Sequence, residues 1–145
     1  MKKALLAILS LFLFSGCSLS YQYAFMDPQL KIEEESLKKL AQRDLLFWEY
    51  YSNKDFEKSY ALELPHLRFL KSLEWYKTFN EPNRKGYKIT LLSIKSIDDN
   101  KAIIQNKYED SEENSLILED RWVLVDEEWY HYFEFSRLPT SESPF

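Results

Sequence analysis

The sequence predicts an α+β domain in which the helices precede the strands. Before residue 80, apolar side chains recur at spacings of three and four, which is the period of an amphipathic helix. After Gly86 the chain is rich in β-branched residues, and short polar turns divide it into about four strand-like segments. Helices that come before the strands, instead of alternating with them, favour α+β over α/β. We therefore expect three N-terminal helices packed on a curved, mainly antiparallel sheet of about four or more strands.

Each predicted helix has a recognisable start or stop signal. The first helix is expected over residues 33–53, and it begins with acidic residues, which the helix dipole favours there. Asp55 is a good N-cap for a short second helix, and we expect Pro65 to end that helix. Ser72 is a good N-cap for a third helix over residues 73–79.

The predicted strands are separated by turns rich in Asp, Glu and Asn. The tightest of these turns is Asp126–Glu128, directly before the last strand. Short turns of this kind join antiparallel neighbours, because a parallel pair needs a long crossover connection. The strands are expected over residues 87–97, 101–108, 115–125 and 129–135.

The start of the chain has the features of a secretory leader. Two lysines precede an uncharged apolar run over residues 4–14, which is shorter than the roughly 20 residues that a membrane-spanning helix needs. Two small residues, Ser15 and Gly16, then lead directly into Cys17, the only cysteine of the chain. This arrangement resembles the lipobox of bacterial lipoprotein precursors, with Phe14 where Leu is usual.

The resemblance implies that Cys17 receives a diacylglyceryl thioether and that residues 1–16 are removed as a signal peptide. Acylation of the new amino group, for example with palmitate, follows in many bacteria. A lone thiol has no disulfide partner, and the thioether would block it. One acyl chain binds a membrane only marginally, whereas two or three anchor a protein stably.

The same resemblance predicts how the chain is organised and where it resides. Residues 17–31 are expected to carry the lipid and form a tether, followed by a domain over 32–138 and a frayed tail over 139–145. Ser18 replaces the Asp that favours the inner membrane, so we expect the outer membrane, facing the periplasm, in a host with two membranes. In a host with one membrane, the expected location is its outer face.

Composition and charge restrict the classes of partner. Hydrophobic residues make up 45% of the chain and aromatic residues 17%, enough to fill a real core. The formal net charge is −5, and removal of the leader with its two lysines makes it more negative. An acidic chain is a poor binder of nucleic acids, so no nucleic-acid partner is expected.

The domain itself resembles the NTF2-like superfamily, in which a curved sheet forms a cone around one long helix. The last hairpin departs from the pattern, because Glu127-Glu128 stands where many relatives have a glycine. The family also often has a short early strand that the residue pattern does not reveal. The resemblance covers roughly residues 33–138 and is carried by Phe47-Trp48, Lys54-Asp55-Phe56 with Tyr60, Leu64-Pro65 with Arg68, Ser72–Tyr76, Asp120–Val123 and Val125–Tyr130.

The cone of this superfamily implies a pocket at its open end. Such pockets are mostly apolar and contain a few polar groups, so a small apolar ligand is one expected partner. The alternative is that the aromatic residues simply fill the core, because they bury large areas. The candidate lining residues are Trp48, Tyr51, Tyr60, Trp75, Phe79, Trp122 and Phe133.

His131 is the main candidate for chemistry in such a pocket, and Asp120 is its first candidate partner. By strand alternation His131 shares a face with Trp129 and Phe133. A general base at this position would need a carboxylate such as Asp120 or Glu119 from the neighbouring strand. Some enzymes of the superfamily use a His–Asp pair for proton transfer. The alternative is a hydrogen-bonded or rim-exposed histidine with no catalytic role.

Other chemistries have no support in the sequence. The chain has one cysteine and two histidines far apart, which excludes the usual zinc ligand sets, so no metal is expected. A glycine-rich phosphate loop cannot form with only two glycines in the chain, and no cofactor is expected.

Two functions of different classes remain. The first is a non-catalytic binding or assembly module of the cell envelope, acting on a partner protein, on a second copy of itself through the open sheet face, or on a small ligand. The alternative is a small pocket enzyme of the isomerase or dehydratase type that uses His131 with a neighbouring carboxylate.

Overall fold

The computed structural model describes residues 24–82 and 87–133, and it has the predicted α+β architecture. Predictions for the signal peptide, Cys17 and the tail over residues 139–145 lie outside the described residues. In chain order the elements are β1 (Ala24–Met26), α1 (Glu35–Ser52), α2 (Phe56–Ala61), α3 (Pro65–Leu70), α4 (Leu73–Asn80), β2 (Lys88–Asp98), β3 (Lys101–Glu109), β4 (Ser115–Val125) and β5 (Glu128–Tyr132).

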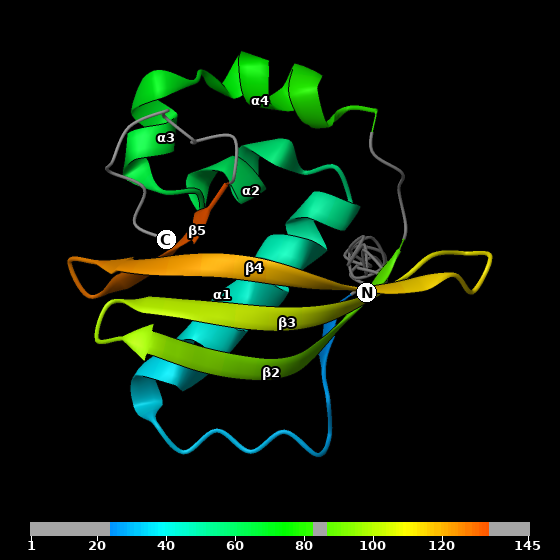
Figure 1. The fold of residues 1–145 in the computed structure, drawn as a ribbon. Helices are drawn as coiled ribbons and strands as arrows, with labels where there is room; N and C mark the ends of the chain where they lie inside the picture. Colours follow the sequence, from blue (N-terminus) through cyan, green and yellow to red (C-terminus); the bar gives the residue numbers. More distant parts are fainter. Residues whose placement is uncertain (1–23, 83–86, 134–145) are drawn as a thin grey trace, which may run out of the picture.

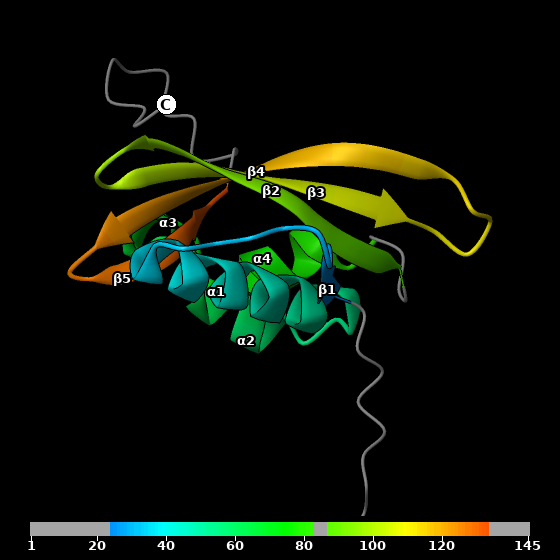
Figure 2. The same cartoon turned by 90° about the horizontal axis from the view of Figure 1, so that it is seen from below.

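The strands form one mixed sheet in the order β1-β2-β3-β4-β5. β1 is parallel to β2, whereas β2 through β5 form consecutive antiparallel pairs. The sheet curls around α1, which crosses behind it in Figure 1 and lies along its concave side in Figure 2. The predicted mainly antiparallel, curved sheet is thereby confirmed.

The core lies between α1 and the concave face of the sheet. The helix presents an apolar stripe because its buried positions recur every three or four residues, as the sequence predicted. The sheet contributes alternate residues of each strand, such as Ile89 and Leu91 of β2 and Ile104 of β3, all fully buried. Burial of these groups supplies most of the free energy of folding.

The helical layer has one helix more than predicted. Pro65 was expected to end the second helix, but it is the first residue of α3. A proline fits this first position because its missing N–H would have no intrahelical partner there. The N-caps were correctly identified, since the Asp55 side chain accepts from Lys58 N and the Ser72 side chain accepts from Trp75 N.

The described domain begins before the predicted boundary at residue 32. Ala24 pairs with Ile89 in the parallel β1–β2 ladder and is 2% exposed. Leu30 and Ile32 also pack against the core. The second half of the predicted tether therefore belongs to the folded domain.

The turn between β4 and β5 has an unusual backbone for its sequence. Asp126 and Glu127 have φ angles of 49° and 67°. Two consecutive residues with positive φ are typical of a type I′ hairpin turn, which Asn and Gly adopt most easily. The turn is therefore tight although neither of its two central residues is a glycine.

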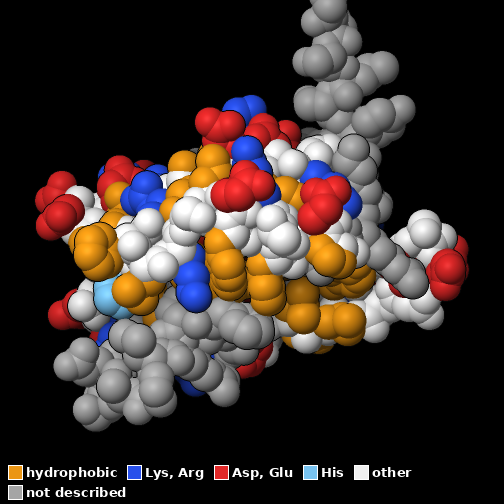
Figure 3. Space-filling view, turned by 90° about the horizontal axis from the view of Figure 1, so that it is seen from above, with side chains coloured by type: hydrophobic (Ala, Val, Ile, Leu, Met, Phe, Trp, Pro, Cys, Tyr) orange, Lys and Arg blue, Asp and Glu red, His pale blue; other side chains and the backbone are white. Residues whose placement is uncertain are grey.

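The surface contains both charged and apolar areas. A band of hydrophobic side chains, bordered by acidic and basic ones, crosses the face seen in Figure 3. Phe69 of α3 and Ile117 of β4 are the most exposed large apolar side chains described, at 86% and 60%. No helix in residues 24–82 and 87–133 is long and apolar enough to cross a membrane.

Candidate functional site

A pocket of about 390 Å³ opens beside α1, the C-terminal end of α4, β4 and β5. Its volume is in the range of small-molecule sites, which run from roughly 300 to 1,000 Å³. Aromatic rings dominate its walls, and one acidic and one basic side chain lie at its inner end. The lining residues are Phe47, Trp48, Tyr51, Phe79, Asn80, Leu118, Glu119, Asp120, Arg121, His131, Tyr132 and Phe133.

The helix α1 brings three of the aromatic rings to the pocket. Phe47, Trp48 and Tyr51 lie at spacings that place them on one face of the helix. Their rings contact one another edge-on or stacked, with centroids 5.5–5.7 Å apart. This mutual packing fixes the positions of the three rings relative to one another.

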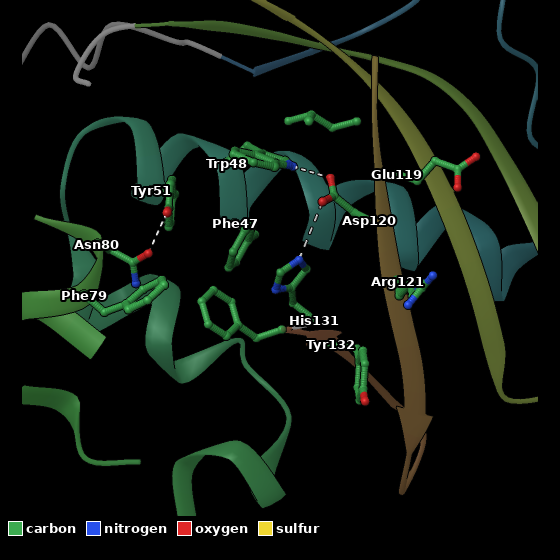
Figure 4. Close-up of a pocket in the computed structure, with 12 residues that line it drawn as sticks. Phe47, Trp48, Tyr51, Phe79, Asn80, Glu119, Asp120, Arg121, His131 and Tyr132 are labelled. Carbon is green, nitrogen blue, oxygen red and sulfur yellow. Dashed lines mark hydrogen bonds and ion pairs between the residues drawn. The ribbon is translucent and has the colours of Figure 1, made fainter. Parts of the chain in front are cut away.

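Asp120 of β4 provides the carboxylate at the inner end of the pocket. Its Oδ2 accepts hydrogen bonds from Trp48 Nε1 at 2.8 Å and from Asn106 Nδ2 at 2.7 Å. The Asp120 residue is 9% exposed. Its neighbours Glu119 and Arg121 point to the other side of the strand, as alternation requires (Figure 4). Asp120 is therefore the acidic group of β4 that faces the pocket interior.

His131 lies between Asp120 and a second carboxylate. Its Nδ1 is 3.0 Å from Glu63 Oε2, and its Nε2 is 3.7 Å from Asp120 Oδ1. The ring also stacks on Phe47, with centroids 4.1 Å apart. Its backbone N–H and C=O bond to Leu62 O and Leu64 N at 2.9 Å. The histidine is thus fixed through its backbone and through both ring nitrogens.

This environment determines the charge of His131. Burial by itself lowers the pKa of an imidazolium, but the charge of Glu63 and the contact with Asp120 outweigh burial and raise the pKa of His131 to about 10. The ring is therefore protonated at neutral pH. Both nitrogens then act as donors toward carboxylates of the protein.

A third buried carboxylate, Asp44, is connected to Asp120 through Asn106. Asp44 of α1 accepts from Asn106 Nδ2 at 3.0 Å and from Trp122 Nε1 at 3.2 Å. Burial and the charge of Asp120 raise the pKa of Asp44 well above its ordinary value, although the two hydrogen bonds oppose this. Asn106 Oδ1 has no hydrogen-bond partner in the described part of the chain. Asn106 thus connects Asp44 to Asp120 through its Nδ2, which donates to both carboxylates.

Glu63 completes the set of buried acidic residues. It lies in the connection between α2 and α3, is fully buried, and forms an isolated parallel bridge with His131. Its Oε1 accepts from Tyr76 Oη at 2.9 Å. Burial and the adjacent Glu63 charge raise the pKa of Tyr76, which keeps the phenol protonated as a donor. Both oxygens of Glu63 therefore have partners.

The predicted lining residues divide into two groups in the structure. Trp48, Tyr51, Phe79 and Phe133 line the pocket. Trp122 is fully buried in the core, where its indole bonds to Asp44. The other two lie in the helical layer: Tyr60 Oη donates to Lys71 O at 2.6 Å, and Trp75 stacks on Phe79 with centroids 5.1 Å apart.

Of the two carboxylates proposed for His131, the structure brings Asp120 to it. Glu119 accepts from Gln105 Nε2 at 3.2 Å on the other side of the strand. The closer partner, Glu63, was not foreseen, because it follows a helix in a segment without periodicity. Asp44 and Asn106 were also missed, although both are polar residues at positions where the apolar period of α1 or the alternation of β3 calls for a buried side chain.

Metal binding and family membership find no independent support. The described residues contain no cluster of three or more His, Cys, Asp or Glu side chains placed to hold a metal ion. No known family model matches the chain, and no curated protein matches it significantly in sequence.

Proposed function

We propose that this chain is a lipid-anchored binding module of the bacterial cell envelope whose NTF2-like domain holds a small ligand in the pocket beside α1, β4 and β5. The observation that carries the proposal is the state of His131. It lies at the inner end of a preformed aromatic pocket, but both of its nitrogens face carboxylates of the protein itself. Because both nitrogens of His131 are engaged by the protein, the site favours binding of a ligand over proton transfer to or from it.

The pKa of His131 supports binding over catalysis. A general base works best when its pKa lies near the ambient pH, because it must be unprotonated and still accept a proton readily. The pKa of His131 is raised to about 10, so the ring has no lone pair to offer at neutral pH. Asp120 is likewise engaged by Trp48 and Asn106. A carboxylate held by hydrogen bonds in this way is a weak base, but it can still recognise a ligand from a fixed position.

The NTF2-like assignment is supported by the way the elements are combined. One long helix lies in the concavity of a curled sheet, short helices follow it, and the strands form a meander after them. The short β1 pairs at the far edge of the sheet from β5. A pocket lies between the long helix and the sheet, where the cone of that superfamily opens.

The location in the envelope rests on the leader and on Cys17. Lipid on that cysteine would attach the chain to a membrane, and would do so stably if two or more acyl chains are present. A partner protein or a second copy of the chain remains a further expectation for the exposed apolar surface, which includes Phe69 and Ile117.

A proton-transfer enzyme is the second candidate, because His131 and Asp120 do meet at the pocket with 3.7 Å between Nε2 and Oδ1. In such an enzyme the imidazolium would act as the acid and Asp120 as the base. This function predicts turnover of a bound ligand that Asp120→Asn abolishes without loss of ligand binding. Binding without any chemical change in the ligand contradicts it.

The binding function is tested with the full chain purified in detergent from its native membranes. Small molecules are extracted from the protein and identified by mass spectrometry. Leu118→Trp places a large ring at the rim of the pocket, whereas Leu116→Trp, two residues away on the same side of β4, adds the same ring outside the lining. We expect a ligand with the wild type and with Leu116→Trp that is absent with Leu118→Trp. Equal ligand content in all three proteins, or none in any, contradicts the function.

A further inference from the structure

We propose that the pocket selects a small organic cation, such as a quaternary ammonium ion or a protonated amine with a short apolar body. This inference rests on the proposed function, because it names the class of ligand that the same pocket would hold. It follows from the charge of the buried network, from the orientation of Asp120 and from the composition of the walls.

The buried network carries more negative than positive groups. Glu63 and Asp120 flank a single imidazolium, His131, so the three together have an excess of one carboxylate. Asp44, connected to Asp120 through Asn106, adds a third acidic side chain. Burial, and then the charge of Asp120, raise the pKa of Asp44, so this region disfavours a further negative charge. Of the charges inside this region, only that of His131 is positive.

An uncompensated buried charge is costly, and a bound cation would compensate it. Asp120 accepts hydrogen bonds from the neutral side chains of Trp48 and Asn106, but these donors do not cancel its negative charge. Its carboxylate borders the pocket, whereas Glu63 is fully buried and saturated by His131 and Tyr76. A cation in the pocket therefore has direct access to one acidic group, Asp120. In this low-dielectric setting the attraction is stronger than it would be in water.

The walls of the pocket also favour positive charge. Six of the lining residues are aromatic, and the faces of such rings carry negative potential that attracts ammonium groups. Each favourable contact of this kind contributes from about 0.5 to about 2 kcal/mol, the larger values applying to desolvated sites. An anion in the pocket would be repelled both by the faces of these rings and by the carboxylate of Asp120. The six aromatic residues are Phe47, Trp48, Tyr51, Phe79, Tyr132 and Phe133.

The other charged residues of the lining do not reverse this balance. Arg121 is positive and Glu119 is negative, and both project to the other side of β4 from Asp120 (Figure 4). Because their formal charges are opposite, together they add no net charge to the lining. His131 itself points its Nε2 at Asp120, so its positive charge is directed toward a carboxylate of the protein.

A charge series of nearly equal shape tests the inference. Choline, 3,3-dimethylbutan-1-ol and 3,3-dimethylbutanoate present the same branched group with a positive charge, no charge and a separate negative charge, respectively. The full chain in detergent is titrated with each compound by calorimetry and by Trp fluorescence, because Trp48 lines the pocket. We expect choline to bind at least about tenfold more tightly than the alcohol, and the carboxylate to bind least.

Two matched variants assign the preference to one side chain. Asp120→Asn keeps the shape and an acceptor for Trp48 but removes the charge, so it should abolish the preference for choline over the alcohol. Asp99→Asn makes the same change at an exposed residue of the β2–β3 turn, outside the pocket lining, and should leave the preference intact. If Asp120→Asn does not fold by circular dichroism, the charge series on the wild type still decides.

The outcomes separate this inference from the proposed function. Equal binding of choline and the alcohol, or tighter binding of the carboxylate, overturns the cation preference while the extracted ligand and the Leu118→Trp variant still support a binding pocket. Absence of binding by the whole series also overturns it. Preference for choline that persists in Asp120→Asn shows that the network does not cause it and equally overturns the inference.

Discussion

His131 Nδ1 lies 3.0 Å from Glu63 Oε2, although the two residues are 68 positions apart in the sequence. Their backbones also form a parallel bridge, in which His131 N donates to Leu62 O and Leu64 N donates to His131 O. The contact therefore joins the helical layer to the last strand through both main chain and side chain. It closes one end of the pocket and fixes the orientation of the imidazole.

The first prediction concerns the charge of His131. Removal of the Glu63 charge in Glu63→Gln should lower the pKa of His131 from about 10, because that charge is the main influence opposing burial. The measurement is a titration of the two histidine Cε1–H signals by NMR. His66, which is exposed on α3, is the internal reference in each sample. An unchanged pKa of His131 in the variant would show that Glu63 is not its counter-ion.

The second prediction follows from linkage between protonation and folding. The folded pKa of His131 is raised above its unfolded value of roughly 6.5, so its contribution to stability is complete below that pH and is lost as the pH rises through about 10. The raised pKa of Asp44 acts in the same direction, because its neutral form is favoured in the folded state. The free energy of unfolding should therefore fall between pH 7 and 10. Urea unfolding at several pH values measures it, and Glu63→Gln should show a shallower fall over the same interval.

Regular elements were easy to predict because each carries its own signal. The strand over residues 115–125 coincides with β4, since its alternation and flanking turns define both ends. Pro65 illustrates the limit: proline stops one helix and starts another equally well, so the residue alone does not say which occurs. The strand β1 was missed because three residues paired in parallel to a distant strand leave no local pattern.

The site was only partly predictable for a related reason. His131 and Asp120 could be paired from the sequence because they occupy neighbouring strands of one hairpin. Glu63 reaches His131 from an irregular connection whose position depends on how the helices pack, which no local rule gives. Asp44 did have a signal, as an acidic residue four positions after Leu40 and four before Trp48 on the apolar stripe of α1.

The third prediction concerns Asp44 and the effect of its buried carboxyl group on the free energy of unfolding. Asp44→Asn should leave the free energy of unfolding unchanged or raise it, and the gain should grow as the pH rises above the ordinary range of a carboxyl group, because the variant removes a carboxylate that burial and Asp120 disfavour. The new amide N–H groups can donate to Asn106 Oδ1, which has no partner in the described part of the chain. Asp44→Leu is the contrasting variant. It leaves the buried Trp122 Nε1 without its acceptor and Asn106 Nδ2 with Asp120 alone, and should cost on the order of 1–3 kcal/mol.

The fourth prediction concerns the turn between β4 and β5. Asp126 and Glu127 have φ angles of 49° and 67°, and a left-handed conformation costs a non-glycine residue roughly 1–2 kcal/mol. The double variant Asp126→Asn, Glu127→Gly supplies the pair that a type I′ turn prefers and should raise the free energy of unfolding by about 1–2 kcal/mol. Glu112→Gly, in the turn before β4 at a residue without positive φ, is the control and should not stabilise the protein. Thermal and urea unfolding of the three proteins measure the effect, and an equal gain from the control would refute the explanation by strain.

The fifth prediction tests the anchor on which the proposed location depends. Cys17→Ser should abolish incorporation of labelled palmitate and move the protein from the membrane fraction to the soluble fraction, because the thioether cannot form on a hydroxyl in the same way. Stable anchoring requires two or more acyl chains, which the lipobox resemblance places on Cys17. Ser18→Asp is the matched variant: it should keep the lipid and, in a host with two membranes, shift the protein toward the inner membrane. Retention of Cys17→Ser in washed membranes would mean that another part of the chain holds it there, and the exposed apolar side chains Phe69 and Ile117 would be the first to replace.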